Sequence, residues 1–296
     1  MHGILNINKP AGKTSRDIVN IVQRQVRPAK TGHAGTLDPL ATGVLVCPVG
    51  QGTKLIEYIQ RLPKTYEAVF LLGRHSDTED IEGAVIELES PPQPTFAEIE
   101  AELPQFLGTI SQMPPAYSAL KVDGKRAYDL ARQGKEVKLA SREIEVYKLE
   151  ILQYEYPQLS MRIECGSGTY VRSLGRDLAR SLGTEAIMSE LVRTAIGDFR
   201  IEEALNPLDN FNREKIEQSL QSTCRAVQAL PSVVVDAEQI VRLAQGKLID
   251  VKPSASGQAS GNEVAAMTSA GELVAVLQPG KESGWRSVKN FANDYL

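Results

Sequence analysis

The chain of 296 residues has few of the side chains that build metal centres and disulfide frameworks. It holds only three histidines and three cysteines, and the cysteines lie far apart without any CxxC spacing: Cys47, Cys165 and Cys224. Three isolated cysteines give neither a disulfide framework nor a structural zinc site, and they fit free thiols in a reducing compartment. The sequence therefore predicts no metal site and a cytoplasmic protein.

Long apolar runs and a leader pattern are missing as well. No apolar run approaches 18 residues, so we expect no transmembrane helix. The first residues, MHGILNINKPAGKTS, lack a basic segment followed by an apolar one, so we expect no signal peptide. A hydrophobic content of 42% and this length suit one large domain with a small one.

Positive charge is in slight deficit, with a net charge of −4 at pH 7. A net negative charge argues mildly against a nucleic-acid partner. The distribution of charge reverses that argument. Residues 76–102 hold nine acids and no lysine or arginine, so the rest of the chain is net positive. Residues 9–30 and 121–142 are rich in lysine and arginine. A nucleic-acid partner would meet these two stretches, with the acids of 76–102 turned away from it, although helices with solvated charged faces would have the same composition.

The segment TGHAGTLDPLATGVLV at 31–46 is the most informative part of the chain. It sets one carboxylate, Asp38, and one imidazole, His33, among four glycine or proline residues. This composition predicts an ordered polar loop, followed by a buried strand at 44–46. A carboxylate on a rigid loop beside a core strand is a candidate nucleophile or general base. A structural loop whose aspartate caps its own turn also fits the composition, and composition alone favours it.

The amino-acid sequence of this loop resembles the catalytic loop of pseudouridine synthases of the TruB-type tRNA pseudouridine-55 synthase family. Five further segments match the same family in the expected order: GILNINKPAGKTS near the start, KTYEA at 64–68, PPAYSALKVDGKRAYDLAR at 114–132, GSGTYVRSLGRDLA at 166–179 and SELVRTAIGDF at 189–199. The resemblance implies isomerisation of uridine to pseudouridine without a cofactor, at U55 in the T-loop of tRNA. It also implies the tRNA T-arm as the partner.

The resemblance further implies roles in the chemistry. Asp38 would be the covalent nucleophile, attacking C1′ of the ribose or C6 of the uracil, and a route through a glycal stays open as a third. A carboxylate that attacks an anomeric carbon has a precedent in retaining glycosidases. Arg172 would keep Asp38 ionised. Tyr66 would stack on the target base and take the C5 proton, although a free phenol is a weak base near neutrality.

The remaining matches concern substrate binding. His33 would enter the space that the flipped base leaves, since the base must be extruded from the RNA before chemistry. Tyr170 would be a second tyrosine of the pocket, and Leu191 would pack against the flipped base. Lys9 would contact the RNA backbone, with an effect that weakens as salt rises. Many relatives carry two consecutive arginines where this chain keeps only Arg193, so we expect one phosphate contact or ion pair to be absent.

Periodicity favours an α+β protein with a mixed, mainly antiparallel sheet and a small β-rich C-terminal domain, and the resemblance implies the pseudouridine synthase fold. Ser15 is a candidate N-cap for the first helix. The expected strands are 3–7, 44–46, 65–72, 142–152, 158–165, 189–199, 232–235, 264–268 and 273–277. The expected helices are 15–26, 53–60, 96–103, 124–133 and 169–182, with one polar helix in 206–230 that Pro231 closes.

These patterns divide the chain into two domains. The resemblance implies that residues 1–230 form the pseudouridine synthase catalytic domain, with an RNA-gripping insertion at about 109–140. It also implies that residues 231–296 form a PUA-like RNA-binding domain. GSGTYVR at 166–172 breaks the GxGxxG pattern, so we expect no nucleotide cofactor.

Two other functions stay open. One is the same reaction on another RNA with guide partners, although the short terminal domain and the lack of a basic tail favour a monomer without protein partners. The other is an RNA-binding tRNA folding helper whose chemistry is incidental. The intact set of Asp38, Tyr66 and Arg172 argues against loss of catalysis.

Overall fold

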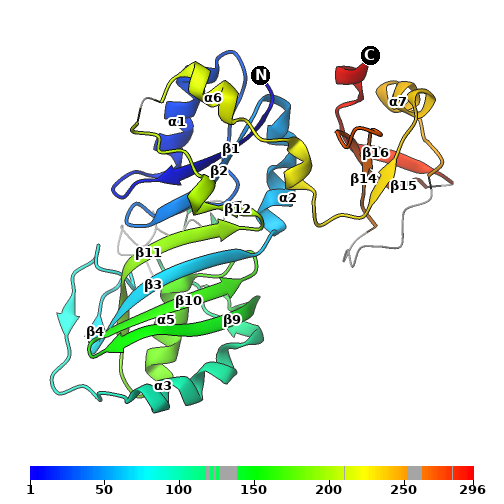
Figure 1. Ribbon diagram of the computed structural model, residues 1–296. Coiled ribbons are helices and arrows are strands. Elements are labelled where there is room, and N and C mark those ends of the chain that lie inside the picture. The colour runs from blue at the N-terminus through cyan, green and yellow to red at the C-terminus, as the bar shows by residue number, and fades with distance from the viewer. Residues whose placement is uncertain (118–120, 123–124, 127–138, 210, 252–261, 282) are drawn as a thin grey trace.

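The computed structural model describes all residues except 118–120, 123–124, 127–138, 210, 252–261 and 282. Figure 1 shows a large sheet with helices around it, and a smaller sheet formed by the C-terminal part of the chain. Within the described residues, no helix is long and apolar enough to cross a membrane.

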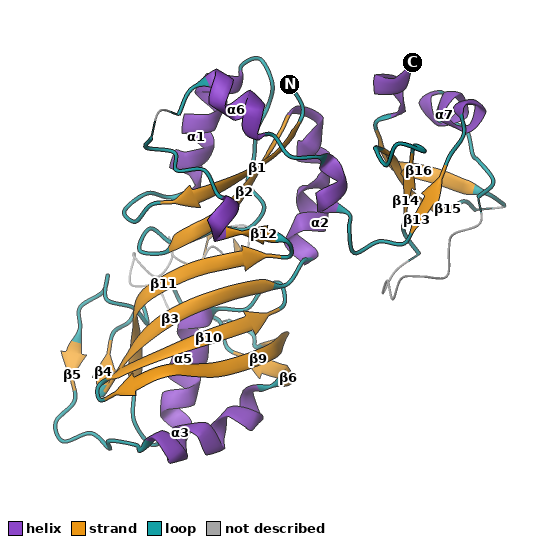
Figure 2. Cartoon of the chain, viewed as in Figure 1, coloured by secondary structure: helices purple, strands orange, loops and turns teal. Residues whose placement is uncertain are grey.

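One mixed sheet organises the first part of the chain. Its strands lie in the order β1 (Gly3–Lys9), β2 (Thr42–Val49), β11 (Ala186–Ile196), β3 (Lys64–Leu72), β10 (Gln158–Cys165), β9 (Arg142–Glu155) and β6 (Gly108–Gln112), and β12 (Phe199–Arg200) pairs with β11. All these pairs are antiparallel except β2 with β11. The predicted mixed, mainly antiparallel sheet is therefore confirmed, and the figure shows it as one twisted surface (Figure 2).

The parallel contact between β2 and β11 brings the catalytic-type loop next to β11. Gly43 pairs with Arg193 and has a φ of +97°. A Cβ at this position would stand 2.3 Å from the carbonyl oxygen of Arg193, so only glycine allows the two backbones to approach so closely.

Helices cover the sheet at several points. The described helices of this part are α1 (Ser15–Val26), α2 (Ile56–Arg61), α3 (Phe96–Glu102), α5 (Val171–Ser181) and α6 (Arg213–Ser219). The N-cap of α1 is Thr14 and not Ser15, because Thr14 and Asp17 form a reciprocal capping box. Ser15 is buried instead, and it hydrogen-bonds the backbone of Leu37.

The single polar helix predicted in 206–230 is wrong. The structure has the short α6, then extended chain, then a 3₁₀ turn, η4 (Thr223–Ala226). The reason is pairing across the fold, since Gln221 exchanges backbone hydrogen bonds with Ile4 and Leu205 does so with Asn6 and Asn8. This segment therefore runs along the free edge of β1, and these long-range bonds outweigh its local helical pattern.

The C-terminal part is β-rich, as predicted. Its sheet has the order β13 (Ser232–Val234), β14 (Val264–Met267), β15 (Leu273–Pro279) and β16 (Trp285–Asn290). The pattern did not predict β16 or α7 (Ala237–Ala244). The sheet contacts α2, where Glu263 accepts hydrogen bonds from the Tyr58 hydroxyl at 2.9 Å and from Arg61 at 2.6 Å.

The expected insertion begins within β6, and a hairpin of β7 (Lys121–Val122) and β8 (Lys125–Arg126) belongs to it. The helix expected at 124–133 lies outside the described residues, apart from the two positions of β8. A second small hairpin, β4 (Arg74–His75) with β5 (Ile86–Glu87), borders the acidic segment.

Candidate active site

Asp38 lies on an ordered loop between α1 and β2. Ser15 Oγ accepts a hydrogen bond from the amide of Leu37 at 2.9 Å, and the Asp38 carbonyl accepts one from the amide of Ala41 at 3.1 Å. The Asp38 side chain is 38% exposed, and its partner is Arg172, with 3.0 Å between Oδ2 and Nη2. The carboxylate therefore faces an arginine from a distant helix at an open surface, as a reactive group requires, while the backbone beneath it is fixed.

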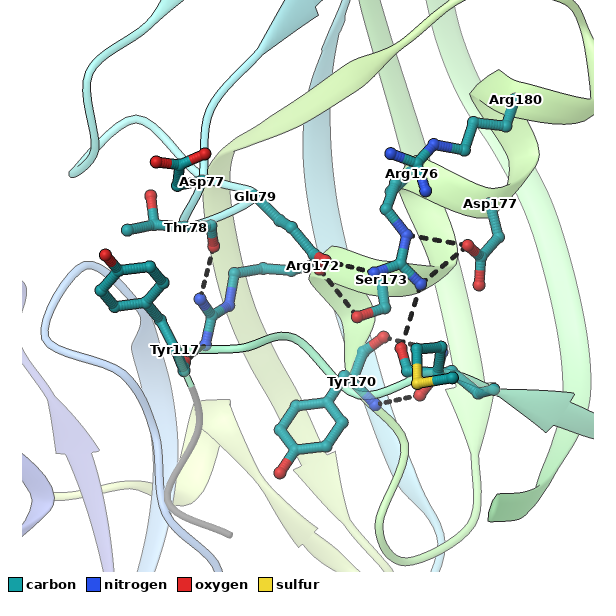
Figure 3. Close-up of polar contacts among 12 residues, drawn as sticks. Asp77, Thr78, Glu79, Tyr117, Tyr170, Arg172, Ser173, Arg176, Asp177 and Arg180 are labelled. Atoms are coloured by element: carbon teal, nitrogen blue, oxygen red, sulfur yellow. Dashed lines mark hydrogen bonds and ion pairs between the residues drawn. The ribbon is translucent and has the colours of Figure 1, made fainter. Parts of the chain in front are cut away.

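Arg172, in the first turn of α5, lies between two carboxylates. Its Nη1 is 3.2 Å from Oδ2 of Asp80, and it donates to the Thr78 carbonyl at 2.6 Å. Nη2 also donates to the Tyr117 carbonyl at 3.2 Å, and Figure 3 shows the guanidinium between Thr78 and Tyr117. The Arg172 and Asp80 side chains are almost fully buried. Arg172 is thus held by Asp80, Thr78 and Tyr117 while its Nη2 pairs with Asp38.

The expectation that the acids of 76–102 lie away from the RNA-binding surface is wrong for two of them. Asp80 pairs with Arg172, and Glu79 pairs with Arg176 on the same helix. Both acids are buried beside the site rather than solvated. A signal for this arrangement was present in α5 itself, whose arginines recur every four residues and so share one helical face that needs acidic partners.

Tyr66 lies on β3 directly opposite Arg193 on β11, and it is 8% exposed. Burial raises the pKa of Tyr66, and the nearby positive charge of Arg193 opposes that rise without cancelling it. The phenol therefore stays protonated near neutral pH. A protonated ring suits stacking on a base better than it suits removal of a proton.

Arg193 is 1% exposed and is directed at the catalytic-type loop. Its Nε donates to the Val44 carbonyl at 2.7 Å, Nη2 to the Gly35 carbonyl at 3.1 Å and Nη1 to the Thr36 carbonyl at 3.4 Å. A phosphate contact is therefore excluded for Arg193 in this position. The guanidinium holds both flanks of the loop that carries Asp38, a role that the sequence pattern did not predict.

Lys9 also holds the loop, and the RNA-backbone contact expected for it is wrong. Its side chain is fully buried, and Nζ donates to the carbonyls of Lys13 at 2.6 Å, Pro10 at 3.0 Å and Pro39 at 3.2 Å. Burial lowers the pKa of Lys9 to about 8, while the charge of Asp38 opposes that shift. The ammonium thus fixes the residue that follows Asp38 instead of facing solvent.

The remaining predicted residues lie around this centre. Leu191 pairs with Ala68 on β3, two positions from the Tyr66 pair, and belongs to the same hydrophobic cluster as Tyr66. The backbone of Tyr170 is fixed by Gln112, whose amide accepts from Tyr170 N at 2.9 Å and donates to Tyr170 O at 3.0 Å. His33 is half-buried on the loop, and burial lowers its pKa, so the imidazole is neutral near pH 7.

The described residues contain no group of three or more histidine, cysteine, aspartate or glutamate side chains that could hold a metal ion. The side chains of the basic residues in β7 and β8 lie outside the described part of the structure. What the structure does assemble is one carboxylate with an arginine, a buried tyrosine and an apolar wall.

Comparison with known proteins shows the family of the chain. Residues 23–171 match the family model of the TruB family pseudouridylate synthase (N terminal domain). The tRNA pseudouridine synthase B of Dehalococcoides mccartyi is 40% identical over 294 residues, which cover 98% of this chain and 97% of that relative. The tRNA pseudouridine synthase B of Syntrophomonas wolfei is 40% identical over 285 residues, covering 94% and 93% of the two chains.

Solved structures give the same result. A chain of an H/ACA RNP bound to a substrate RNA containing 2′-deoxyuridine has a TM-score of 0.75 and 25% identity, covering 98% of this chain and 84% of that chain. A chain of the archaeal box H/ACA sRNP Nop10-Cbf5 complex has a TM-score of 0.74 and 25% identity, covering 97% and 85%. With its fold and nearly its whole length matched, the chain belongs to the TruB family of pseudouridylate synthases.

Proposed function

We propose that this protein converts uridine to pseudouridine at position 55 in the T-loop of tRNA, by base flipping and covalent catalysis through Asp38. The observation that carries the proposal is the contact of 3.0 Å between the half-exposed Asp38 carboxylate and the buried Arg172 guanidinium. The relatives named tRNA pseudouridine synthase B support tRNA as the substrate.

The reaction breaks the N1–C1′ bond, turns the detached uracil and joins its C5 to C1′. A proton leaves C5 and N1, released from C1′, takes one up, so the product is an isomer of uridine and neither a redox partner nor a transferred group is needed. Asp38 supplies the nucleophile, at C1′ or C6, or assists a glycal route. Arg172 places its positive charge against this carboxylate and orients it. Asp80 on the other side of Arg172 fixes the direction in which the guanidinium points.

Tyr66 and Leu191 form the walls against which the flipped uracil packs. Flipping a base costs a few kcal/mol, and stacking on an aromatic ring offsets that cost. The raised pKa of Tyr66 favours a stacking role, and a proton acceptor for C5 would then be Asp38 or water. His33, neutral and on the same loop as Asp38, would occupy the space left in the RNA, and Tyr170 would form the pocket wall at the start of α5.

RNA binding would use the exposed basic residues of α1 and the turn that follows it. Those are Arg16, Arg24, Arg27 and Lys30. RNA loops with unstacked bases are the usual targets of sequence-specific RNA recognition. The insertion at about 109–140 and a PUA-like domain at 231–296 would extend the contact along the T-arm. We further infer that the protein acts alone, as a monomer in the cytoplasm, where its three free cysteines would stay reduced.

The test is release of tritium from C5-labelled uridine in an unmodified tRNA transcript, with no other protein present. We expect about one equivalent from the wild-type protein and none from Asp38→Asn, with tRNA affinity retained, because the amide keeps the shape but is no nucleophile. Mapping of the product should give position 55. Tight tRNA binding without tritium release by the wild-type protein would contradict the proposal and favour a guided or folding-helper role.

A further inference from the structure

A largely buried ionic cluster lies next to Asp80, the second acidic partner of Arg172. Glu79 accepts a hydrogen bond from Ser173 Oγ at 2.7 Å and forms an ion pair with Arg176. The Glu79 and Arg176 side chains are only 12% and 10% exposed. Figure 3 shows that Ser173 and Arg176 reach Glu79 from α5, the helix that also carries Arg172. The reaction derived above uses none of these three groups.

The backbone at Glu79 is in a conformation that is uncommon for its residue type. Its φ is +60°, in the left-handed region that favours glycine. In an ordinary extended segment, successive side chains point to opposite sides. The left-handed turn lets Glu79 and Asp80 both reach α5, where they contact Arg176 and Arg172 respectively. An uncommon backbone held beside a functional group is typical of sites where the conformation serves the function.

The surrounding structure fixes this conformation from two directions. The Glu79 carbonyl accepts from Met188 N at 2.9 Å, and Ile81 N donates back to the Met188 carbonyl at 3.1 Å, so β11 holds the backbone on both sides of Asp80. Glu79 itself is tied to α5. Asp80 thus has little freedom once Glu79 is in place.

We propose that Glu79, Ser173 and Arg176 are positioning residues that hold Asp80 against Arg172 and so fix the geometry at which Arg172 meets Asp38. This inference rests on the proposed function of Asp38. The cluster acts along the chain, because Glu79, held by Ser173 and Arg176, fixes the backbone from which its neighbour Asp80 reaches Arg172. Arg176 also donates a hydrogen bond to the Met113 carbonyl at 3.0 Å, so the segment that follows β6 is attached to the same arginine.

A buried ion pair that serves stability alone would have a different signature. Its loss would lower the melting temperature and leave the chemistry of the folded fraction unchanged. A positioning role predicts that the rate of the chemical step falls while tRNA affinity stays. Small errors in the placement of catalytic groups are enough for this, since a displacement of about 1 Å costs up to about 100-fold in rate.

The helix offers a matched control. Arg180 follows Arg176 by one turn and pairs with Glu185, again as an arginine of α5 with an acid, but its side chain is 50% exposed and it contacts none of the groups that hold Asp80. Arg180→Gln should therefore leave the rate unchanged.

The experiment is a single-turnover measurement of tritium release with enzyme in excess, together with tRNA binding and thermal melting. We expect Glu79→Gln to lower the rate constant roughly 10- to 100-fold, with the dissociation constant for tRNA changed less than about twofold. Ser173→Ala, which removes one hydrogen bond and keeps the ion pair, should lower the rate constant about threefold to tenfold. This milder variant decides the question if Glu79→Gln does not fold.

A double-mutant cycle with Asp80→Asn separates positioning from an independent effect. If Glu79 acts through Asp80, adding Glu79→Gln to Asp80→Asn should produce no further fall in the rate constant. Multiplied effects in the double variant, or Glu79 and Ser173 variants as fast as wild type, would overturn the proposal while wild-type activity still upholds the proposed function. Absence of tritium release from the wild-type protein would overturn both.

Discussion

Replacing Arg193 by methionine should destabilise the protein and slow the proposed reaction. The change removes the donors of two good hydrogen bonds, to the carbonyls of Val44 at 2.7 Å and Gly35 at 3.1 Å, and a weaker third one. A hydrogen bond to a charged group contributes about 1.5–3 kcal/mol, so the loss is roughly 3–6 kcal/mol. Methionine also removes the cost of burying a cation, which offsets part of this loss and leaves a net destabilisation of about 3 kcal/mol. For a chain of this size that is a fall of roughly 5–10 °C in melting temperature.

The assay compares wild type, Arg193→Met and Arg193→Lys by urea unfolding and by single-turnover tritium release. Lysine keeps the charge but cannot span the Gly35 and Val44 carbonyls as the guanidinium does, so it should give intermediate stability and rate. Hydrogen exchange in residues 31–46 should rise in the same order. A methionine variant with wild-type melting and a wild-type rate would refute the view that Arg193 holds the loop. Full recovery by lysine would show that charge alone suffices.

Three further substitutions test packing and charge away from the site. Burial lowers the pKa of Lys64 to about 8. Between that pH and the ordinary lysine pKa, the folded state therefore binds fewer protons than the unfolded state. The free energy of unfolding of the wild type, measured by urea titration, should therefore rise relative to that of Lys64→Met as pH rises from about 8 to 10. Gly175→Ala should destabilise although alanine favours helices, because the added Cβ would stand 2.1 Å from the Phe70 ring; melting and the rate constant should both fall. Glu263→Gln weakens the hydrogen bond to Arg61 and should make the linker near Pro231 easier to cleave by limited proteolysis.

The elements that the sequence predicted well are those whose pattern is local. β3 alternates between buried and half-buried residues along its whole length, as the period-two pattern of KTYEA and the following residues indicated. α5 ends near the predicted Gly183. The prediction for 206–230 failed because the conformation of this segment depends on pairing with Ile4, more than 200 residues away. No local pattern contains that information.

The site follows the same division. The motif around Asp38 and the position of Arg172 could be identified from short runs of sequence, and the structure brings the two side chains together. Asp80, Lys9 and Arg193 could not be assigned in this way. A charged residue in a sequence is normally interpreted as solvated, and its burial becomes visible only when the partners that satisfy it are known.

The burial of these cations has a common physical cause. A catalytic loop that must stay open to RNA cannot bury its own backbone under apolar side chains, so the carbonyls beside Asp38 need donors from elsewhere. Arg193 supplies them on the side of Gly35, and Lys9 supplies one at Pro39. The same two cations place positive charge beneath the loop, and the charge of Asp38 opposes the fall that burial causes in the pKa of Lys9. The order of the loop and the positive charge beneath Asp38 thus arise from one set of buried side chains.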